Sequence, residues 1–211
     1  MSTLFRNAPI FGSIPPPLAR RSARFIAWKA GEVLVDALSA ATGFSVPDEP
    51  LQPFLINLPM LVGRYEPATL AAMREIVKPG MTVVDGGAHI GYFTVALSKM
   101  VGPHGRVLAF EMNPATLRRL RHNVRHLRNV EIISAALGVS DDRGTMYQSP
   151  GLTSSASVTE TKPGLHAAQS VQIRSLASVV DERCIESIDF LKLEIEGNEP
   201  IVLRTLSGPG K

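Results

Sequence analysis

The chain has 211 residues, which is enough for one ordinary domain with an additional arm but too few for two full domains. Hydrophobic residues make up 45% and charged residues 19% of it, a composition typical of a globular protein with an apolar core. The formal net charge of +3 argues against a dedicated nucleic-acid-binding protein. The single cysteine, Cys184, excludes an intramolecular disulfide and a cysteine-based metal site.

The first 62 residues are interpreted as an N-terminal arm. Residues 1–17 lack a continuous apolar stretch and end in three prolines, unlike a signal peptide. Apolar residues then recur at helical spacing from Leu18 to about Ala41, with basic residues clustered near the start. We expect this basic amphipathic helix to pack on its own domain, and binding to a membrane surface is the alternative. Residues 43–63 contain four prolines and predict an irregular linker.

The composition also bears on the compartment. No apolar run approaches the roughly 18 residues that a membrane span needs, so no stable membrane insertion is expected. A lone thiol is compatible with a reducing compartment. The sequence therefore predicts a soluble, cytoplasmic protein.

Residues 63–211 are interpreted as one α/β domain. Its first half alternates amphipathic helices with short strands of continuous apolar character. The expected helices cover residues 67–77, 92–101 and 114–128, and the expected strands cover residues 81–84, 106–111 and 130–133. This alternation predicts a parallel sheet with right-handed crossovers and helices on both faces.

The second half of the domain departs from this alternation. Residues 144–148 and 170–174 alternate polar and apolar side chains, which predicts short exposed strands. The Ser- and Thr-rich stretch 151–164 between them is interpreted as a loop or lid. Residues 188–195 are again apolar and predict a buried strand, and Asn198 is suited to cap the helix that follows.

A glycine-rich turn follows the first buried strand, in the segment VVDGGAHIGYFT at residues 83–94. The strand brings Asp85 to its carboxyl end, where ligands bind in open α/β sheets, and Gly86, Gly87 and Gly91 let the backbone approach a ligand. The turn lacks the G-x-G-x-x-G spacing of dinucleotide-binding folds, and an acid in this place would repel phosphates. It would attract a cation, and S-adenosyl-L-methionine carries a sulfonium and an ammonium group without a phosphate. A turn that serves packing alone is the alternative.

A second acid, Glu111, ends the next predicted strand. A carboxylate there can accept hydrogen bonds from both hydroxyls of a ribose, as in other nucleoside-binding Rossmann folds. An exposed acid at a strand end is the alternative. Because Asp85 and Glu111 lie at neighbouring strand ends, together they favour a site for a positively charged nucleoside.

Four segments resemble the FkbM family of methyltransferases in order and spacing. They are GRYEPATLAAMREIVKPGMTVVDGGAHIGYFTVAL, GRVLAFEMNP, NVEIISAALGVSDDRG and SIDFLKLEIEGNEPIVL, and they span about residues 60–206. The resemblance implies the Rossmann-like class I methyltransferase fold, an α/β three-layer sandwich with a mostly parallel sheet. It also implies methyl transfer from S-adenosyl-L-methionine, usually to a hydroxyl of a sugar, lipid or secondary metabolite, so the expected partner is a small-molecule hydroxyl acceptor.

The resemblance also implies roles for single residues. Asp85, Gly87 and Gly91 would line the methionine end of the cofactor, Glu111 would hold the ribose, and Ala135 and Ala136 would border the adenine. The complete set of expected cofactor-binding residues is Asp85, Gly86, Gly87, Ala88, His89, Gly91, Glu111, Met112, Ala135 and Ala136. The sequence departs from the family's usual pattern at four places, and these departures affect the acceptor side more than the cofactor side. His89 replaces Asn, Glu111-Met112-Asn113-Pro114 replaces Glu-Pro, Glu194 replaces Asp, and Leu176-Ala177 replaces Leu-Asp.

The catalytic prediction rests on two acids near the end of the last expected strand. Glu194 and Glu196 are two residues apart, so they share a face at the ligand-facing end. A hydroxyl acceptor benefits from a general base, and we predict Glu196 as base or acceptor anchor, with Glu194 second. Alternatively, Glu196 stabilises the turn by binding backbone amides. His89 is a further proton acceptor by its pKa, although a loop-packing role is favoured. Two carboxylates without a third ligand do not predict a metal site.

Two other functions stay open. The helix expected over 114–128 carries five arginines that could contact phosphates, but they lie opposite its apolar stripe as a solvated face does, so no nucleic-acid partner is expected. A complete sheet of this fold has further strands after 188–195, so we expect the fold to be incomplete in its C-terminal half. The exposed strand edge would then be covered by a second copy or another chain. A catalytically inactive, truncated homologue is therefore the other alternative.

Overall fold

The computed structural model describes residues 30–31, 33–46, 57–148, 156–158 and 166–206. The expectations for residues 1–29, including the start of the basic helix, and for most of the 151–164 loop fall outside this part of the chain. Residues 33–42 are helical. The other elements are α2 (Leu58–Leu61), α3 (Pro67–Ile76), β1 (Thr82–Gly86), α4 (Tyr92–Val101), β2 (Arg106–Phe110), α5 (Pro114–Val124), β3 (Val130–Ile133), β4 (Ala136–Gly138), β5 (Asp142–Gln148), β6 (His166–Ser175), α6 (Leu176–Glu182), β7 (Phe190–Leu193) and α7 (Glu199–Leu206).

The central sheet confirms the predicted parallel arrangement. Its strand order is β3-β2-β1-β7, and every neighbouring pair is parallel. The chain passes from β1 outward to β2 and β3, and β7 then pairs with the other side of β1. The strand order therefore reverses at β1, and a crevice for a ligand opens at the carboxyl ends of the strands beside such a reversal.

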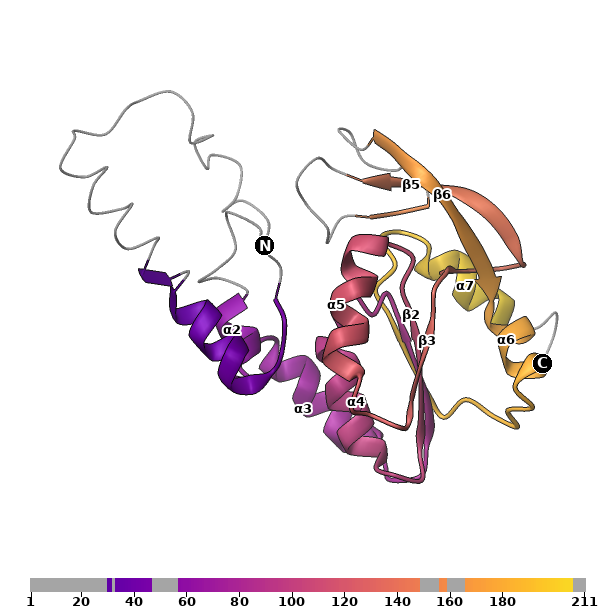
Figure 1. The fold of residues 1–211 in the computed structure, drawn as a ribbon. Coiled ribbons are helices and arrows are strands. Elements are labelled where there is room, and N and C mark those ends of the chain that lie inside the picture. Colours follow the sequence, from indigo (N-terminus) through magenta and orange to yellow (C-terminus); the bar gives the residue numbers. More distant parts are fainter. Residues whose placement is uncertain (1–29, 32, 47–56, 149–155, 159–165, 207–211) are drawn as a thin grey trace, which may run out of the picture.

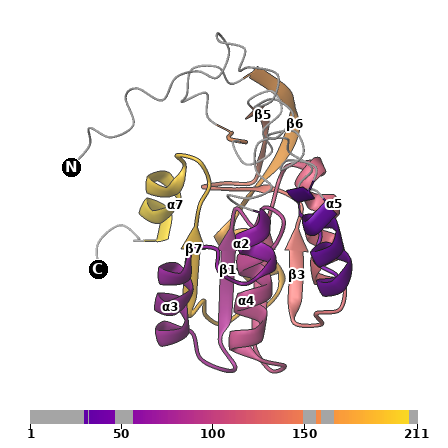
Figure 2. The same ribbon diagram turned by 90° about the vertical axis from the view of Figure 1, so that its left-hand side faces the viewer.

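Helices cover both faces of this sheet, so β1 is buried on both sides. Val83 points into an apolar cluster with α3 and α4, while Val84 points into a cluster with α6 and α7. Figure 1 shows the sheet from its edge, with α3, α4 and α5 on one side and α6 and α7 on the other. Figure 2 looks onto the α3 and α4 side, with β7, β1 and β3 in sequence across the sheet. The three-layer sandwich expected from the sequence is confirmed.

A second, small sheet has the strand order β4-β6-β5, and its strands β5 and β6 lie above the central sheet in the view of Figure 1. The two predicted exposed strands are confirmed as an antiparallel pair, β5 and β6, with an irregularity between Met146 and Tyr147. The short strand β4 and the helix α6 were not predicted. α6 begins at Ser175, whose hydroxyl accepts a hydrogen bond from the Ser178 amide.

The N-terminal segment packs against the domain, and the expectation of an irregular linker over 43–63 is wrong at α2. Asn123 of α5 is buried, and its side chain pairs with both the N–H and the C=O of Ser45. Arg119 donates to the carbonyl of Val46 at 3.1 Å. Val35 of the first helix shares an apolar cluster with Ile90, the residue after the glycine turn's His89. The segment is therefore docked beside the carboxyl end of β1.

In the part of the chain that the structure describes, β7 is an edge strand of the central sheet. Within the same residues, no helix has both the length and the apolar character needed to span a membrane.

Candidate active site

One pocket lies over the carboxyl ends of β1, β2 and β7. Its floor comes from the turn after β1 (Gly87 to Ile90), from Glu111 and Met112 after β2, and from the loop after β7 (Glu194 to Glu196). Ala135 to Leu137 close one end. Other walls come from Met60 and Tyr65 of the N-terminal segment and from Ala156 and Val158 between β5 and β6. The pocket thus occupies the crevice that the reversal of strand order creates.

The turn after β1 needs glycine at position 87. Gly87 has φ of 76°, and a Cβ there would lie 2.0 Å from the backbone oxygen of Glu194. The backbone N–H groups of Gly87 and Ala88 both donate to the carbonyl of Phe110, at 3.1 and 2.8 Å. These hydrogen bonds join the ends of β1 and β2, and the amide of Glu194 donates to the carbonyl of Gly86 at 2.9 Å, which joins the end of β7 to them. His89 also has positive φ, at 52°, which costs a non-glycine residue some strain and places it at the pocket wall.

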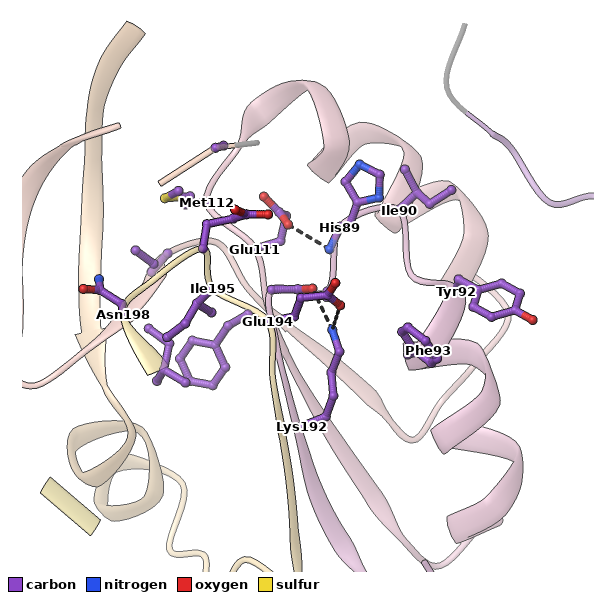
Figure 3. Close-up of a pocket in the computed structure, with 18 of the residues that line it drawn as sticks. His89, Ile90, Tyr92, Phe93, Glu111, Met112, Lys192, Glu194, Ile195 and Asn198 are labelled. Atoms are coloured by element: carbon purple, nitrogen blue, oxygen red, sulfur yellow. Dashed lines mark hydrogen bonds and ion pairs between the residues drawn. The ribbon is translucent and has the colours of Figure 1, made fainter. Parts of the chain in front are cut away.

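Glu111 is fixed by backbone hydrogen bonds at the centre of the pocket (Figure 3). Its side chain is 8% exposed; Oε2 accepts from the His89 amide at 2.8 Å, and Oε1 accepts from the Asn113 amide at 2.7 Å. Burial raises the pKa of Glu111, and hydrogen bonds from Asn113, Thr116, His89 and Met112 oppose the rise. Glu111 lines the pocket, and a carboxylate in this place is suited to accept hydrogen bonds from the hydroxyls of a ribose.

Asp85 lies behind the pocket instead of lining it. It is fully buried, Oδ2 accepts from the Thr94 hydroxyl at 2.6 Å, and Oδ1 lies 3.1 Å from Lys192 Nζ. Oδ1 has no well-directed hydrogen bond, so the contact with Lys192 is primarily an ion pair. Gly86 and Gly91 also stay outside the pocket lining and pack against Leu193 and Leu120.

Lys192 is the residue that the sequence analysis did not assign. It points from β7 toward the turn, and its Nζ lies 3.1 Å from Asp85 Oδ1, 3.2 Å from Glu194 Oε2 and 3.1 Å from the carbonyl oxygen of Gly87 (Figure 3). Nζ also sits 5.2 Å from the centre of the Phe93 ring. Burial favours the neutral amine, but the two carboxylates outweigh it and raise the pKa of Lys192. The lysine therefore stays charged inside the protein.

Both predicted catalytic acids line the pocket, but they follow the strand instead of lying on it. β7 ends at Leu193, and the chain turns at Glu196, which has φ of 56°. The turn is stabilised by Glu199, whose carboxylate accepts from the amides of Ile195 and Gly197 at 2.7 and 2.9 Å. Glu199 therefore makes backbone contacts of the same kind as those that were the alternative role for Glu196.

The loop between β5 and β6 contributes a contact that positions Glu196. Ser157 is buried, and its backbone forms a bridge to Tyr147 of β5. Its hydroxyl donates to the carbonyl of Glu196 at 3.1 Å. The small sheet is therefore connected directly to the predicted catalytic loop.

An aromatic group forms the wall on the Lys192 side of the pocket. Tyr65 and Phe93 each contact Tyr92, with ring centres 5.3 Å apart in both pairs. Burial, followed by the negative charges of Glu66 and Glu194, raises the pKa of Tyr65, so its hydroxyl stays protonated and able to donate. Tyr65 was not predicted as a site residue, because it precedes the helix α3 in sequence and is brought to the pocket by the docking of the N-terminal segment.

The arginines of α5 are partly engaged within the protein. Arg119 binds the N-terminal segment, and Arg121 donates to the Ser134 hydroxyl at 2.8 Å. Over the described residues, no group of three or more His, Cys, Asp or Glu side chains could hold a metal ion.

A parallel sheet with this order, a pocket over its strand ends and a buried carboxylate after β2 define a Rossmann-like domain of the class I methyltransferase fold. The chain belongs to the FkbM methyltransferase family, because the sequence model of the methyltransferase FkbM domain matches residues 85–210, more than half of the chain.

The chain is also similar to individual proteins outside the family model. A protein-L-isoaspartate O-methyltransferase from Triticum aestivum is 28% identical over 120 residues, which are 57% of this chain and 50% of the relative. The chain thus spans half the length of the curated relative it matches. Among solved structures, a SAM-dependent methyltransferase from Aquifex aeolicus is 32% identical, with a TM-score of 0.30 over 33% of this chain and 38% of its own. Fibrillarin from Aeropyrum pernix with bound S-adenosyl-L-methionine is 27% identical, with a TM-score of 0.30 over 33% and 32%.

Proposed function

We propose that this domain binds S-adenosyl-L-methionine and transfers its methyl group to a hydroxyl oxygen of a small-molecule acceptor, of the sugar, lipid or secondary-metabolite kind. The observation that carries the proposal is the geometry of Glu111. A buried carboxylate, held by two backbone amides and open to the pocket, is suited to accept hydrogen bonds from the two hydroxyls of a ribose.

The rest of the pocket fits a nucleoside without phosphate. Met112, Ala135 and Ala136 provide an apolar surface for adenine next to Glu111. Among the described residues that line the pocket, the cationic side chain is Lys192, and it forms ion pairs with the carboxylates of Asp85 and Glu194. A phosphate would find no unpaired cation there, whereas a cationic group would find Glu194 and Glu196.

The acceptor side lies between the β7 loop and the aromatic wall. When bound, S-adenosyl-L-methionine would supply an activated methyl group. Glu196 would take the proton of the acceptor hydroxyl; it lines the pocket, and its loop is held by Glu199 and Ser157. Tyr65 and Phe93 offer an apolar surface for the body of the acceptor and exclude water from that side. Catalysis would then rest on alignment and on one general base.

Binding of S-adenosylhomocysteine, measured by titration calorimetry, tests the cofactor assignment. We expect the wild type to bind and Glu111→Ala to lose about 1–3 kcal/mol of affinity, because the ribose hydroxyls lose their buried acceptor. Glu75→Ala is the matched control, since Glu75 is an exposed acid on α3 that does not line the pocket. Absence of heat above background with the wild type would support the inactive-homologue alternative.

A methyl-transfer assay tests the reaction. Incubation with labelled S-adenosyl-L-methionine and a panel of hydroxylated sugars and lipids should give a methyl ether that mass spectrometry locates on oxygen. Glu196→Gln should bind S-adenosylhomocysteine as the wild type does and lose about 10²-fold or more in turnover, the contribution expected of a general base. Methylation on nitrogen or carbon would refute the O-methyl assignment.

A further inference from the structure

Three charged side chains, Asp85, Lys192 and Glu194, lie together at the turn after β1. Asp85, the acid of the glycine-rich segment, is fully buried and outside the pocket lining. Lys192, whose side chain is only 11% exposed, lies between it and the pocket. The charges of Asp85 and Lys192 cancel. The remaining negative charge belongs to Glu194, whose side chain is 58% exposed and lines the pocket.

The ammonium group of Lys192 is surrounded by oxygen atoms of the protein. An ammonium group carries three N–H bonds, and its Nζ has three oxygen partners, from Asp85, Glu194 and the backbone of Gly87. These partners come from the end of β1, the turn and the loop after β7. Through its ion pair with Glu194 and its hydrogen bond to the Gly87 carbonyl, the lysine links the Glu194 carboxylate to the glycine turn. The methionine end of the cofactor would lie next to this backbone.

Resting on the cofactor assignment above, we propose that Lys192 is a positioning residue that neutralises Asp85 and holds the Glu194 carboxylate in the pocket, so that Glu194 meets the cationic sulfur of S-adenosyl-L-methionine. Asp85 then acts on the ligand only through Lys192. Glu196 keeps the role of base that is proposed above.

The assignment predicts discrimination between two ligands that differ in the charge of one atom. S-adenosyl-L-methionine has a positive sulfur, whereas the sulfur of S-adenosylhomocysteine is neutral. The ratio of their dissociation constants isolates the contact at sulfur, because the ribose, adenine and amino-acid contacts are common to both. A variant that merely loosens the fold should weaken both ligands alike and leave the ratio unchanged.

Calorimetry with both ligands on five proteins tests the proposal. Glu194→Gln should lower the preference for S-adenosyl-L-methionine by about fivefold, the upper range for one partly exposed ion pair. Glu194→Asp should retain part of it. The double variant Asp85→Asn/Lys192→Met avoids an uncompensated buried charge, and it should lose the preference as Glu194→Gln does, although Glu194 is still present. Glu186→Gln, at an exposed acid before β7, is the matched control and should behave as the wild type.

The outcomes distinguish failure of this inference from failure of the cofactor assignment. An unchanged ligand ratio in Glu194→Gln, with both ligands still bound, overturns the inference and leaves the cofactor assignment intact. The same holds if the double variant keeps the full preference, because Lys192 would then have no positioning role. Failure of the wild type to bind either ligand would overturn the cofactor assignment and this inference with it.

Discussion

The buried pair of Asp85 and Lys192 makes a quantitative prediction about stability. Asp85 has zero exposure, and its Oδ1 has no directed donor other than the approach of Lys192 Nζ at 3.1 Å. Lys192→Met would remove the counter-charge of this buried carboxylate. Removing one partner of a buried pair typically costs about 3–5 kcal/mol, whereas replacing both partners is often close to neutral.

The double-mutant cycle therefore has a distinct signature. We expect Lys192→Met to lose about 4 kcal/mol of unfolding free energy and Asp85→Asn/Lys192→Met to lose less than about 1.5 kcal/mol. Asp85→Asn alone should cost less than Lys192→Met, because Lys192 keeps Glu194 as a partner. The two single losses would then exceed the loss of the double variant, as coupled neighbours do.

Urea unfolding followed by circular dichroism measures the cycle. If the free energy of unfolding falls by about 2 kcal/mol per M urea, a loss of about 4 kcal/mol lowers the unfolding midpoint by about 2 M. The carboxylates raise the pKa of Lys192 in the folded state, so its contribution is fully present below the ordinary value of 10.5 and is lost as pH rises through the higher folded-state pKa. A neutral buffer thus reports the charged pair. Additive losses, or a Lys192→Met loss below about 1 kcal/mol, would refute the reasoning.

Three further predictions concern the turn, the carboxylate after β2 and the docked N-terminal segment. Gly87→Ala should abolish S-adenosylhomocysteine binding and lower the melting temperature more than Gly80→Ala, since both glycines have positive φ but only Gly87 has backbone within 4 Å of the new Cβ. Affinity for S-adenosylhomocysteine should fall as pH is lowered through the pKa of Glu111, which is raised above 4.5, because the protonated acid accepts fewer hydrogen bonds. Calorimetry across this pH range measures the fall, and Glu111→Gln should not show it. Asn123→Ala should cost about 1–3 kcal/mol and speed hydrogen exchange at Ser45, whose N–H and C=O both bind that amide; unchanged exchange would show that the segment docks by other contacts.

The sequence predicted best those elements whose ends are marked by local chemistry. The helix over 92–101 has the predicted bounds because Gly91 and Gly102, both with positive φ, flank it. The helix over 114–128 was predicted too long. α5 ends at Val124, but Leu127 continues the apolar stripe in the following turn, so periodicity alone does not show where the helical hydrogen bonds stop.

The missed elements depend on contacts between distant residues. β4 has three residues, Ala136 to Gly138, and exists because β6 pairs with it from more than thirty positions away. The predicted strand 188–195 is shorter in the structure, because Glu199 and the positive φ of Glu196 turn the chain after Leu193. Neither effect has a periodic signal in the sequence.

At the site, the sequence identified the pocket's acids but not their partners. Glu111, Glu194 and Glu196 all line the pocket as expected. The partner of Asp85 could not be predicted, because Lys192 reaches the turn from a strand 105 residues beyond Gly87. The signal available was the alternation of Lys192 and Glu194 at the end of a buried strand, where a charged side chain needs a counter-charge.

A crystal structure with S-adenosylhomocysteine would show where the nucleoside binds. We expect both ribose hydroxyls to lie within hydrogen-bonding distance of the Glu111 carboxylate, with the adenine against Met112 and Ala135 and the sulfur facing Glu194. A nucleoside bound elsewhere on the domain, or one whose ribose does not contact Glu111, would contradict this expectation.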